Sequence, residues 1–385
     1  MPLSRYNLRI ARAENDLLFT EDGQRYIDLF SAHGTTWLGH ANKSIAADIA
    51  EQLQRVWITG GLETAVAAEA KALIETFFPP THGLAALYST GMEAAEFAIR
   101  VARRVTGKNG VVGFENSMHG KSLATAYLGW DNKDGVSLPE FHRLPLLHLS
   151  SEADILRRLE EVLEQRPISA VFVEPVQGSG GGHVASTRFC EEVFRLCRAR
   201  GVLLVFDEIL TGFYRTGTPF CFSAMGFVPD IVLVGKAMGN GFPVSGVVAD
   251  RRYAIQKEML PGSTYAGNPL AAAAVVATLR QIKGMDLSGK IAQIERMVLA
   301  ALDPLLQIGV AVRGKGAIWI IELPRGWDVE EVAVNIYRAG VCVGYAGRHI
   351  RILPAATITL ENLSRACAVV VGELVRTSHG RTKGE

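Results

Sequence analysis

Two charged side chains at the ends of neighbouring apolar runs carry the clearest chemistry in this sequence. One run ends in Asp207, and 29 residues later the run Ile231–Val234 leads through a glycine to Lys236. A lysine amine can attack a carbonyl carbon, and a carboxylate can hold a proton on a nearby base. Lys236 could instead have a purely structural role. Because burying an ammonium group is costly, its aliphatic chain would then lie in the core and its ammonium group in solvent.

A candidate anion site lies upstream, in Thr90-Gly91-Met92-Glu93 at the start of a predicted helix. The first N–H groups of a helix are unpaired and attract anions, although Thr90 and Glu93 also fit an ordinary capping box. An acid, a lysine and a phosphate cradle together are what pyridoxal 5'-phosphate requires. The lysine forms a Schiff base with the aldehyde, the acid keeps the pyridine nitrogen protonated, and the helix end holds the phosphate.

A second glycine cluster, from Gly178 to Gly182, follows the apolar run that ends at Glu174. The stretch from Gly180 to Ala185 fits the G-x-G-x-x-G/A pattern of dinucleotide sites, with Asp207 at roughly the distance of the acid such sites use. Runs of glycine produce this pattern easily, and this one lies outside a first strand–helix–strand unit. A dinucleotide-dependent oxidoreductase therefore stays an alternative.

The elements that must position these residues alternate between strand and helix. Short, continuous apolar runs separated by helical spacing predict a mostly parallel central sheet buried on both faces, an α/β fold. In such sheets, ligands bind beyond the carboxyl ends of the strands. The predicted strands are Gly110–Phe114, Ser169–Glu174, Val202–Phe206, Ile231–Val234 and Val244–Val248, and the predicted helices are Glu93–Arg104, Ser186–Arg200 and Pro269–Ile282.

The pattern changes after about residue 285. A helix over Lys290–Leu306, a strand over Ile318–Glu322 and a helix over Val329–Ala339 indicate a smaller α+β domain. The first forty residues are too few to form a core alone. We therefore expect an N-terminal segment (residues 1–42) that packs on the small domain, a large cofactor domain (43–284) and the small domain itself (285–385), which is built from both chain ends.

Nearly the whole chain resembles the class III (fold-type I) pyridoxal-phosphate aminotransferases. This family includes ornithine, acetylornithine and 4-aminobutyrate aminotransferases and glutamate-1-semialdehyde aminomutase. The most specific matches are Leu204 to Phe213, Arg215-Thr216-Gly217 and Pro229-Asp230-Ile231 leading to Gly235-Lys236. Supporting matches are Gly23 to Asp28, Leu38-Gly39-His40, Thr90 to Ala94, His119-Gly120, Glu174 to Gly178, and Ser263 to Pro269. The resemblance implies the fold-type I transferase architecture.

The resemblance also implies roles for individual residues. Lys236 corresponds to the Schiff-base lysine, whose amine then shuttles the proton between substrate and cofactor. Asp207 corresponds to the partner of the pyridinium nitrogen, and Ile209 to a residue that packs on one face of the ring. Backbone N–H groups of Gly91 and Met92 correspond to phosphate donors.

Further implied positions surround the cofactor and the substrate. Glu174, Met118 and His119 correspond to residues beside the ring, and Glu174 would support the site. Thr264 matches a threonine that reaches the phosphate of the neighbouring subunit, which implies a homodimer.

Two residues are candidates for contact with the substrate. Arg351 stands where many members keep an arginine for a substrate carboxylate, and a guanidinium suits bidentate recognition of that group. Its alternative is a surface arginine on a short strand. Trp37 is a candidate wall of the substrate pocket, as is His33, with core packing the alternative for both.

The sequence departs from the family pattern at four positions. Met92 replaces a serine or threonine in the phosphate loop, and Met118 replaces the stacking aromatic before His-Gly. Leu210 stands where a glutamine is common. Ser179 replaces a glutamate that masks the substrate arginine, so Arg351 is expected to stay available in both half-reactions. These changes indicate a divergent member.

Composition excludes several other classes of function. The chain has 385 residues, 40 Lys plus Arg and 39 Asp plus Glu, and a net charge of +1, which gives no electrostatic basis for binding nucleic acid. No apolar window is long enough to span a membrane. Five scattered cysteines without a CxxC indicate buried free thiols, and with no signal-peptide pattern we expect a cytoplasmic protein. No cluster has the spacing of a metal site.

The prediction is therefore an aminotransferase that uses pyridoxal 5'-phosphate and works by a ping-pong route through the Lys236 Schiff base. It would move an amino group from a glutamate- or alanine-like donor to a carbonyl acceptor. An aminomutase or a decarboxylase would share every cofactor residue and stays open as an alternative. A non-catalytic cofactor-binding protein is disfavoured, because both Lys236 and Asp207 are present.

Overall fold

The computed structural model describes residues 8–130, 138–145, 149–259 and 262–381, and it divides into two compact units. The large unit comprises residues Ser44–Tyr214 and Thr218–Met285. The small unit comprises the described residues before Ser44, the three residues Arg215–Gly217, and those from Asp286 onward. Among the described residues, no helix is both long and apolar enough to cross a bilayer.

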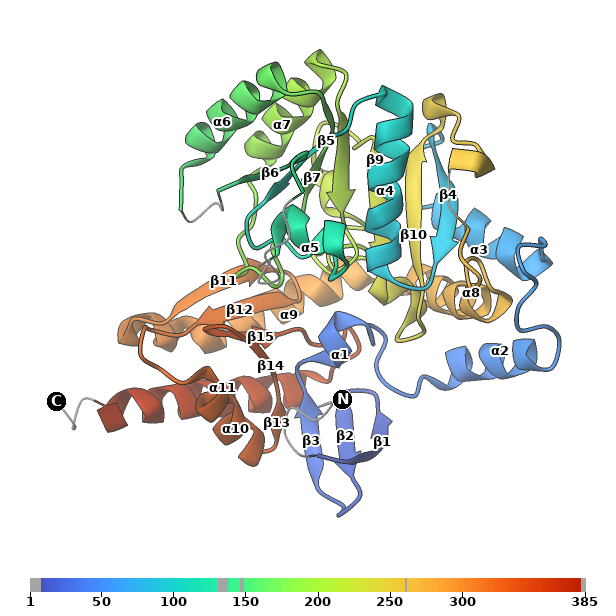
Figure 1. Ribbon diagram of the computed structural model, residues 1–385. Coiled ribbons are helices and arrows are strands. Elements are labelled where there is room, and N and C mark those ends of the chain that lie inside the picture. The colour runs from blue at the N-terminus through green and yellow to red at the C-terminus, as the bar shows by residue number, and fades with distance from the viewer. Residues whose placement is uncertain (1–7, 131–137, 146–148, 260–261, 382–385) are drawn as a thin grey trace. The chain divides into compact units, whose positions relative to one another are not determined.

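The large unit is built on a mixed, mostly parallel sheet (Figure 1). β5, β6, β7, β8 and β9 run parallel, whereas β10 runs antiparallel to both β9 and β4. The order of its strands across the sheet is β4 (His82–Tyr88), β10 (Ser245–Asp250), β9 (Ile231–Gly235), β8 (Leu203–Asp207), β7 (Ile168–Val173), β5 (Gly110–Phe114) and β6 (Phe141–Leu144). The α/β prediction is confirmed.

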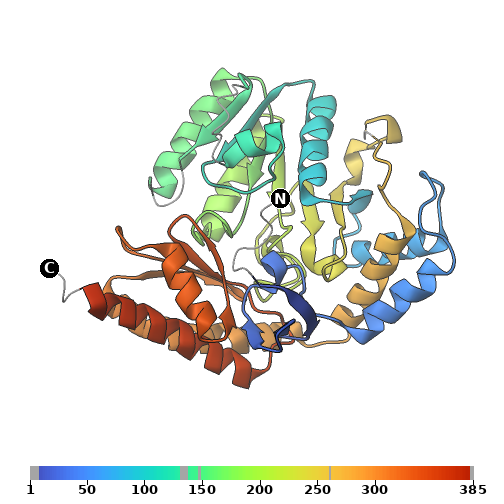
Figure 2. The ribbon, with the colours of Figure 1, turned by 60° about the horizontal axis from the view of Figure 1, so that its bottom comes forward.

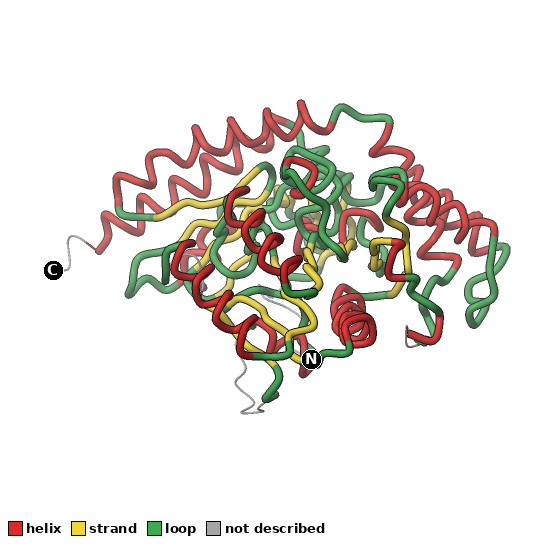
Figure 3. Tube along the Cα trace, turned by 90° about the horizontal axis from the view of Figure 1, so that it is seen from above, coloured by secondary structure: helices red, strands yellow, loops and turns green. Residues whose placement is uncertain are grey.

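A helix follows each of β4, β5, β6 and β7 along the chain. Figure 3 draws the helices in red and the strands in yellow. Every residue of β7, β8 and β9 is buried, as expected of strands covered on both faces. α4 packs against β7, β8, β9 and β10, and α7 packs against β8. The helices are α2 (Lys43–Leu53), α3 (Ala65–Glu75), α4 (Gly91–Thr106), α5 (Leu123–Gly129), α6 (Glu152–Gln165), α7 (Thr187–Ala199) and α8 (Pro269–Lys283).

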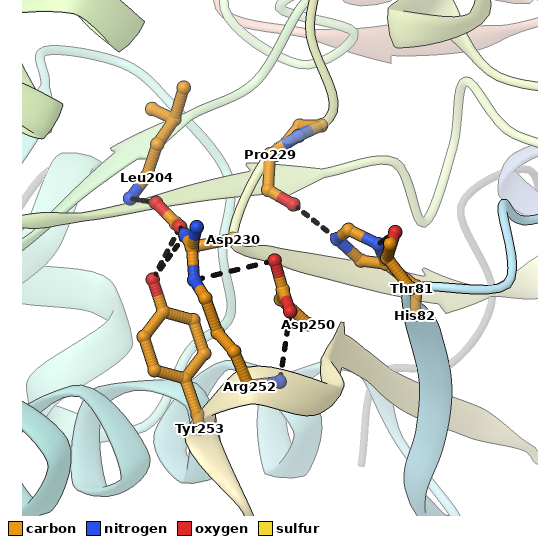
Figure 4. Close-up of polar contacts among 8 residues, drawn as sticks. All are labelled: Thr81, His82, Leu204, Pro229, Asp230, Asp250, Arg252 and Tyr253. Atoms are coloured by element: carbon orange, nitrogen blue, oxygen red, sulfur yellow. Dashed lines mark hydrogen bonds and ion pairs between the residues drawn. The ribbon is translucent and has the colours of Figure 1, made fainter.

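A buried polar cluster fixes the amino-terminal end of β9 (Figure 4). The Asp230 carboxylate accepts hydrogen bonds from the backbone N–H of Leu204, at 2.8 Å, and from the Tyr253 hydroxyl, at 2.5 Å. It also pairs with Arg252, whose guanidinium lies 3.3 Å from Asp250. These contacts tie the starts of β8 and β9 to the end of β10.

The small unit holds two four-stranded sheets within its described residues. The first has the order β1 (Ile10–Glu14), β2 (Leu17–Thr20), β3 (Arg25–Asp28) and β13 (Val341–Cys342), so that a strand from each chain end pairs in parallel. The second has the order β11 (Ala311–Lys315), β12 (Ile318–Glu322), β15 (His349–Ile352) and β14 (Gly344–Ala346).

The described part of the small unit also contains the helices α9 (Leu287–Leu302), α10 (Val329–Arg338) and α11 (Leu360–Arg381). α9 and α11 lie side by side although they are far apart in the sequence (Figure 2). The helix predicted over Lys290–Leu306 ends earlier, at Leu302, and a 3-10 helix over Asp303–Ile308 follows it. Pro304 explains the break, because it has no N–H to continue the α-helical pattern.

The turn Ser31–Gly34, labelled α1 in Figure 1, is not a right-handed helix. Ser31, Ala32 and His33 have φ of 47°, 47° and 63°, and Gly34 has φ of 81°. Side chains with a Cβ rarely adopt this left-handed region, so the turn carries conformational strain. It also exposes Ala32 and His33 while burying Ser31 and Gly34.

Candidate active site

The predicted cofactor residues of the large unit gather at one edge of its sheet. In parallel strands the carboxyl ends share an edge, and β4 joins them because β10 runs antiparallel to both of its neighbours. Ser245, at the start of β10, pairs with Tyr88 on one side and Gly235 on the other. The residues that follow β4, β8 and β9 are thereby brought to the same edge.

The start of α4 forms the candidate phosphate cradle. Thr90 caps the helix through its side chain, which accepts from the N–H of Glu93 at 3.2 Å, and the Glu93 carboxylate bonds back to the N–H of Thr90 at 2.9 Å. The capping box and the anion site are therefore compatible. The N–H groups of Gly91 and Met92 lie at the first two helical positions, which have no acceptor within the helix.

Gly91 is also required sterically. A Cβ at Gly91 would lie 2.6 Å from Cδ1 of Ile209, and a Cβ at Gly235 would lie 3.3 Å from Cγ2 of the same side chain. Ile209 therefore packs between the start of α4 and the end of β9. This contact joins three predicted site positions, at Gly91, Ile209 and the strand that precedes Lys236.

Asp207 is buried, with 4% of its surface exposed, and its two carboxylate oxygens have different partners. Oδ2 lies 2.8 Å from Nδ1 of His119, and Oδ1 accepts from the N–H of Ile209 at 3.1 Å. Nδ1 of His119 therefore serves as the donor toward an ionised Asp207 carboxylate, which can only accept. Nε2 of His119 is buried without a hydrogen-bond partner among the described residues.

Glu174 connects two loops behind this pair. Its carboxylate accepts from the N–H of Met118 at 3.0 Å and from the N–H of Gly178 at 3.2 Å. The pKa of Glu174 is raised to about 7, chiefly by burial and also by the Asp207 charge, while His119, the N–H of Met118 and Lys236 oppose the rise. The electrostatic coupling indicates that all four side chains share one environment.

Lys236 follows β9 directly and begins the 3-10 turn Lys236–Gly239. Its φ is +40°, a left-handed value unusual for a lysine, and its side chain is half-buried. Strained backbone of this kind concentrates at functional sites, where the surrounding structure holds it in place. The preceding residue is a glycine packed against Val244, Ser245 and Ile209.

Three of the four departures from the family pattern have structural partners. A Cβ at Gly120 would lie 2.9 Å from Cγ of Met92, and a Cβ at Gly178 would lie 2.1 Å from Cδ2 of Leu210. Met118 contributes its N–H to Glu174.

The sequence analysis did not identify Ser245 as a site residue. Its hydroxyl donates to the carbonyl of Thr90, the N-cap of α4, at 2.6 Å and so holds the start of that helix. The sequence did place Ser245 near the start of the predicted strand Val244–Val248, which could have indicated a position near the site.

The glycine run after β7 lacks the strand–turn–helix geometry of a dinucleotide site. Val176 and Val184 form an isolated antiparallel bridge, and Gln177 donates its N–H to the carbonyl of His183. The next helix, α7, has Ser186 as its cap, and the Ser186 hydroxyl bonds to Glu152. A carboxylate therefore lies where a pyrophosphate would bind.

In the small unit, Arg351 lies on β15 between β12 and β14. It is buried, with 6% of its surface exposed, and its guanidinium carbon lies 6.0 Å from the centroid of the Phe30 ring. Trp37 is fully buried, and the guanidinium carbon of Arg215 lies 3.8 Å from its ring centroid. Contact of Arg351 and Trp37 with a substrate stays a prediction.

Thr264 is exposed in the large unit, on the segment before α8. Its neighbour Ser263 donates to the Glu93 carboxylate at 3.0 Å, and Gly267 donates its N–H to the carbonyl of Leu87 at 3.0 Å. The segment is thus attached to the start of α4.

Comparison with known proteins identifies the family. The family model described as aminotransferase class-III matches residues 3–372. The chain belongs to the class-III aminotransferases. This enzyme is 31% identical, over 94% of both chains, to the LysW-aminoadipate semialdehyde/glutamate semialdehyde transaminase of Sulfolobus acidocaldarius. It is equally similar, at 31% and 94% of both chains, to the acetylornithine aminotransferase of Bacillus subtilis.

A solved structure is similar throughout its length. The amine transaminase from an uncultivated Pseudomonas species, in its PLP-bound form, has a TM-score of 0.90 and 26% identity, and covers 96% of this aminotransferase and 95% of that chain. The predicted family, fold class and enzyme class are thus confirmed, and so is pyridoxal phosphate as the cofactor.

The residues of the large unit fit this cofactor. Uncapped N–H groups at the start of α4 suit a phosphate, and the Asp207 carboxylate and Lys236 amine follow strands that end at the same edge. Because Gly91 has no side chain, the start of α4 can lie directly beside Ile209. Among the described residues, no group of three or more His, Cys, Asp or Glu could hold a metal ion, and all five cysteines are free and buried, as predicted for the thiols.

Proposed function

We propose that this class-III aminotransferase moves an amino group by a ping-pong route, from a glutamate- or alanine-like donor to a carbonyl acceptor. The observation that carries the proposal is the convergence of Asp207, Lys236 and the start of α4 on one sheet edge. When bound, pyridoxal phosphate supplies the carbonyl carbon that accepts the amino group and a ring that withdraws electrons.

Each residue then has a defined task. Lys236 would hold the cofactor through its Nζ, and the same amine would accept and return the proton of the substrate carbon. Asp207 keeps a proton on the pyridine nitrogen, and His119 keeps Asp207 in place through the 2.8 Å contact. The N–H groups of Gly91 and Met92 hold the phosphate, while Ile209 and Met118 pack beside the ring and Glu174 supports both loops.

Arg351 binds the carboxylate of the donor. A guanidinium offers paired N–H donors that match the two oxygens of a carboxylate. Its burial favours this role, because an ion pair removed from water is screened weakly. In the family pattern a glutamate stands at the position of Ser179 and masks the substrate arginine, and an uncharged Ser179 would leave Arg351 available to both substrates.

The functional enzyme is a homodimer in the cytoplasm. Thr264 is exposed beside the start of α4, where it can reach the phosphate of the neighbouring subunit. Five buried free cysteines fit a reducing compartment. Aldehydes are the acceptors to test first, because one relative is named for semialdehydes.

Mutation of Lys236 to Ala tests the cofactor assignment. We expect the near-visible absorbance of the lysine-bound cofactor to disappear and transamination to fall by at least about 10³-fold. Lys121, an exposed lysine of the large unit, provides the matched control as Lys121→Ala. Persistence of the absorbance band in Lys236→Ala would refute the assignment.

A panel of amino donors and carbonyl acceptors tests the reaction class. Transamination predicts one oxo acid released for each donor consumed, together with an aminated acceptor. An aminomutase would give no net oxo acid, and a decarboxylase would release carbon dioxide. Arg351→Ala should raise KM for every carboxylate donor, and unchanged kinetics for all of them would remove Arg351 from the mechanism.

A further inference from the structure

Arg215 is a buried cation that the proposed chemistry does not use. It has no exposed surface, and in the described part of the chain its guanidinium donates to backbone carbonyls rather than to a carboxylate. Burial lowers the pKa of Arg215 to about 9, so the guanidinium still carries its charge at neutral pH. Burying a charge without an ionic partner costs desolvation free energy, so the contacts that hold Arg215 in this position need to be identified.

The partners of Arg215 come from both ends of the chain. Its Nη2 donates to the carbonyl of Gly34 at 2.6 Å, and its Nη1 donates to the carbonyl of Pro354 at 2.8 Å. The face of the guanidinium lies on the ring of Trp37, with 3.8 Å between the guanidinium carbon and the ring centroid. Because the guanidinium is planar, these three contacts fix its orientation completely.

One of these partners closes the strained turn. Gly34 is the last residue of Ser31–Gly34, whose left-handed conformation must be held by its surroundings. The Asp28 carboxylate holds the beginning of the turn, because it accepts from the N–H groups of Phe30 and Ser31 at 2.8 and 3.0 Å. Arg215 holds its end.

The other partner lies three residues beyond Arg351. Pro354 follows β15, so the bond from Arg215 fixes the chain just after the strand that carries Arg351. The turn and the strand also meet through Phe30. Its ring contacts His33, with centroids 4.3 Å apart, and fills the space left by Gly344, where a Cβ would lie 2.3 Å from Phe30 and 3.3 Å from Cβ of Arg351.

We propose that Arg215 is a positioning residue for substrate recognition, which fixes the Ser31–Gly34 turn and the end of β15 so that Arg351 is held in its binding orientation. The inference rests on the proposed role of Arg351 as the group that binds the donor carboxylate. It assigns to Arg215 a part in selecting substrates by their carboxylate, exerted through Phe30 and Pro354 and without contact with the substrate.

Arg215→Lys tests this inference, because lysine keeps the charge but cannot bond both carbonyls and stack on Trp37 at once. We expect KM for glutamate or alanine to rise roughly 10- to 100-fold, the effect of a misplaced binding group. The inhibition constant of propionate, a carboxylate without an amino group, should rise in parallel. Values of kcat and the cofactor absorbance should stay within about twofold of wild type, since the predicted cofactor residues lie in the other unit.

Arg348→Lys is the matched control. Arg348 also donates to a backbone carbonyl of the small unit, that of Leu323 at 2.8 Å, but it pairs with Glu322 and is partly exposed. It should leave KM unchanged. Should Arg215→Lys be insoluble, Phe30→Leu removes the ring between turn and strand and should raise KM in the same direction.

The outcomes separate the inference from the function on which it rests. If Arg351→Ala leaves KM for carboxylate donors unchanged, the proposed role of Arg351 fails. If Arg351→Ala raises KM but Arg215→Lys and Phe30→Leu do not, only the positioning role fails. A fall in kcat and cofactor absorbance that matches the change in KM would assign Arg215 to general stability and overturn the proposal.

Discussion

In the large unit, the charged residues of the site stand at the ends of adjacent strands, whereas in the small unit Arg215 and Arg351 are held by segments from distant parts of the sequence. Asp207 is the last residue of β8 and Lys236 follows β9, the strand paired with it, so sheet geometry sets both positions. Arg215 depends instead on Gly34 and Pro354, which are 181 and 139 residues away.

The contrast suggests that regular structure and irregular structure have different roles in this protein. Strand ends are rigid and repeatable, which suits a cofactor that every member of a family binds in the same way. A strained turn fixed by one buried cation can vary without disturbing a sheet, which suits the recognition of a particular substrate. Four substitutions test this distinction.

The largest effect is expected when the large unit loses its central charge. Asp207→Asn keeps the shape of the side chain but removes the negative charge beside His119, so kcat/KM should fall by roughly 10²- to 10⁴-fold. Steady-state kinetics over a range of donor concentrations measures the change. Asp154→Asn, at the exposed start of α6, is the control. A change below threefold would show that Asp207 does not tune the cofactor.

Glu174→Gln should alter how stability depends on pH. The folded pKa of Glu174 is raised from 4.5 to about 7, so its favourable contribution is full below pH 4.5 and is lost as the pH rises through 7. Relative to wild type, the variant should therefore gain about 3 kcal/mol in unfolding free energy between pH 4.5 and pH 8.

Denaturant unfolding of the cofactor-free protein at several pH values measures this gain. The exposed Glu161→Gln, on α6, should track wild type at every pH. If the difference between Glu174→Gln and wild type does not change with pH, Glu174 is not protonated near neutrality.

Gly91→Ala should affect cofactor affinity more than stability. The added methyl would displace Cδ1 of Ile209, a flexible end of a side chain, so we expect a loss of about 1 kcal/mol in stability. Cofactor affinity should fall roughly tenfold, or about 1.4 kcal/mol. The double variant with Ile209→Val lacks the displaced carbon and should recover most of that affinity in a cofactor titration; failure to recover would mean that Ile209 is not the obstacle.

The smallest effect concerns the strained turn of the small unit. Ala32→Gly relieves a left-handed alanine at φ 47°, and after the greater flexibility of the unfolded chain is subtracted, stability should rise by about 0.5–1 kcal/mol. Ala300→Gly, an exposed position in α9, should lower stability by about 1 kcal/mol instead. Thermal unfolding of both variants measures whether stability rises in Ala32→Gly and falls in Ala300→Gly. A fall in the stability of Ala32→Gly would show that the turn is not strained.

The sequence predicted the sheet and its edge well, because those features depend on local patterns. Apolar runs fixed the strands Gly110–Phe114 and Ile318–Glu322 to the residue, and the residues after two other runs named Asp207 and Lys236. The resemblance to a family added the roles, which periodicity alone could not supply.

The small unit shows what local patterns miss. The parallel pairing of β3 with β13 joins residues more than three hundred positions apart, and no spacing in the sequence announces it. The sequence Ser-Ala-His-Gly likewise does not predict a left-handed turn. That conformation is held by hydrogen bonds with Asp28 and Arg215, which lie outside the turn. Arg215 stood in a recognised motif, but its partners were visible only in three dimensions.

The pairing of Ile27 with Val341 has a consequence for the synthesis of this chain. A ribosome adds roughly 5–20 residues each second, so the first strands emerge well before the partner that completes their sheet. During that interval β3 has a free edge, and Tyr26 lacks Tyr337, the ring on which it finally stacks with centroids 4.7 Å apart. The large unit can fold while translation continues, but the sheet of β1, β2 and β3 stays incomplete until Val341 and Cys342 have been synthesised. A product truncated before β13 would therefore retain the predicted cofactor residues of the large unit but lack the strand that completes this sheet and Arg351, the predicted substrate residue.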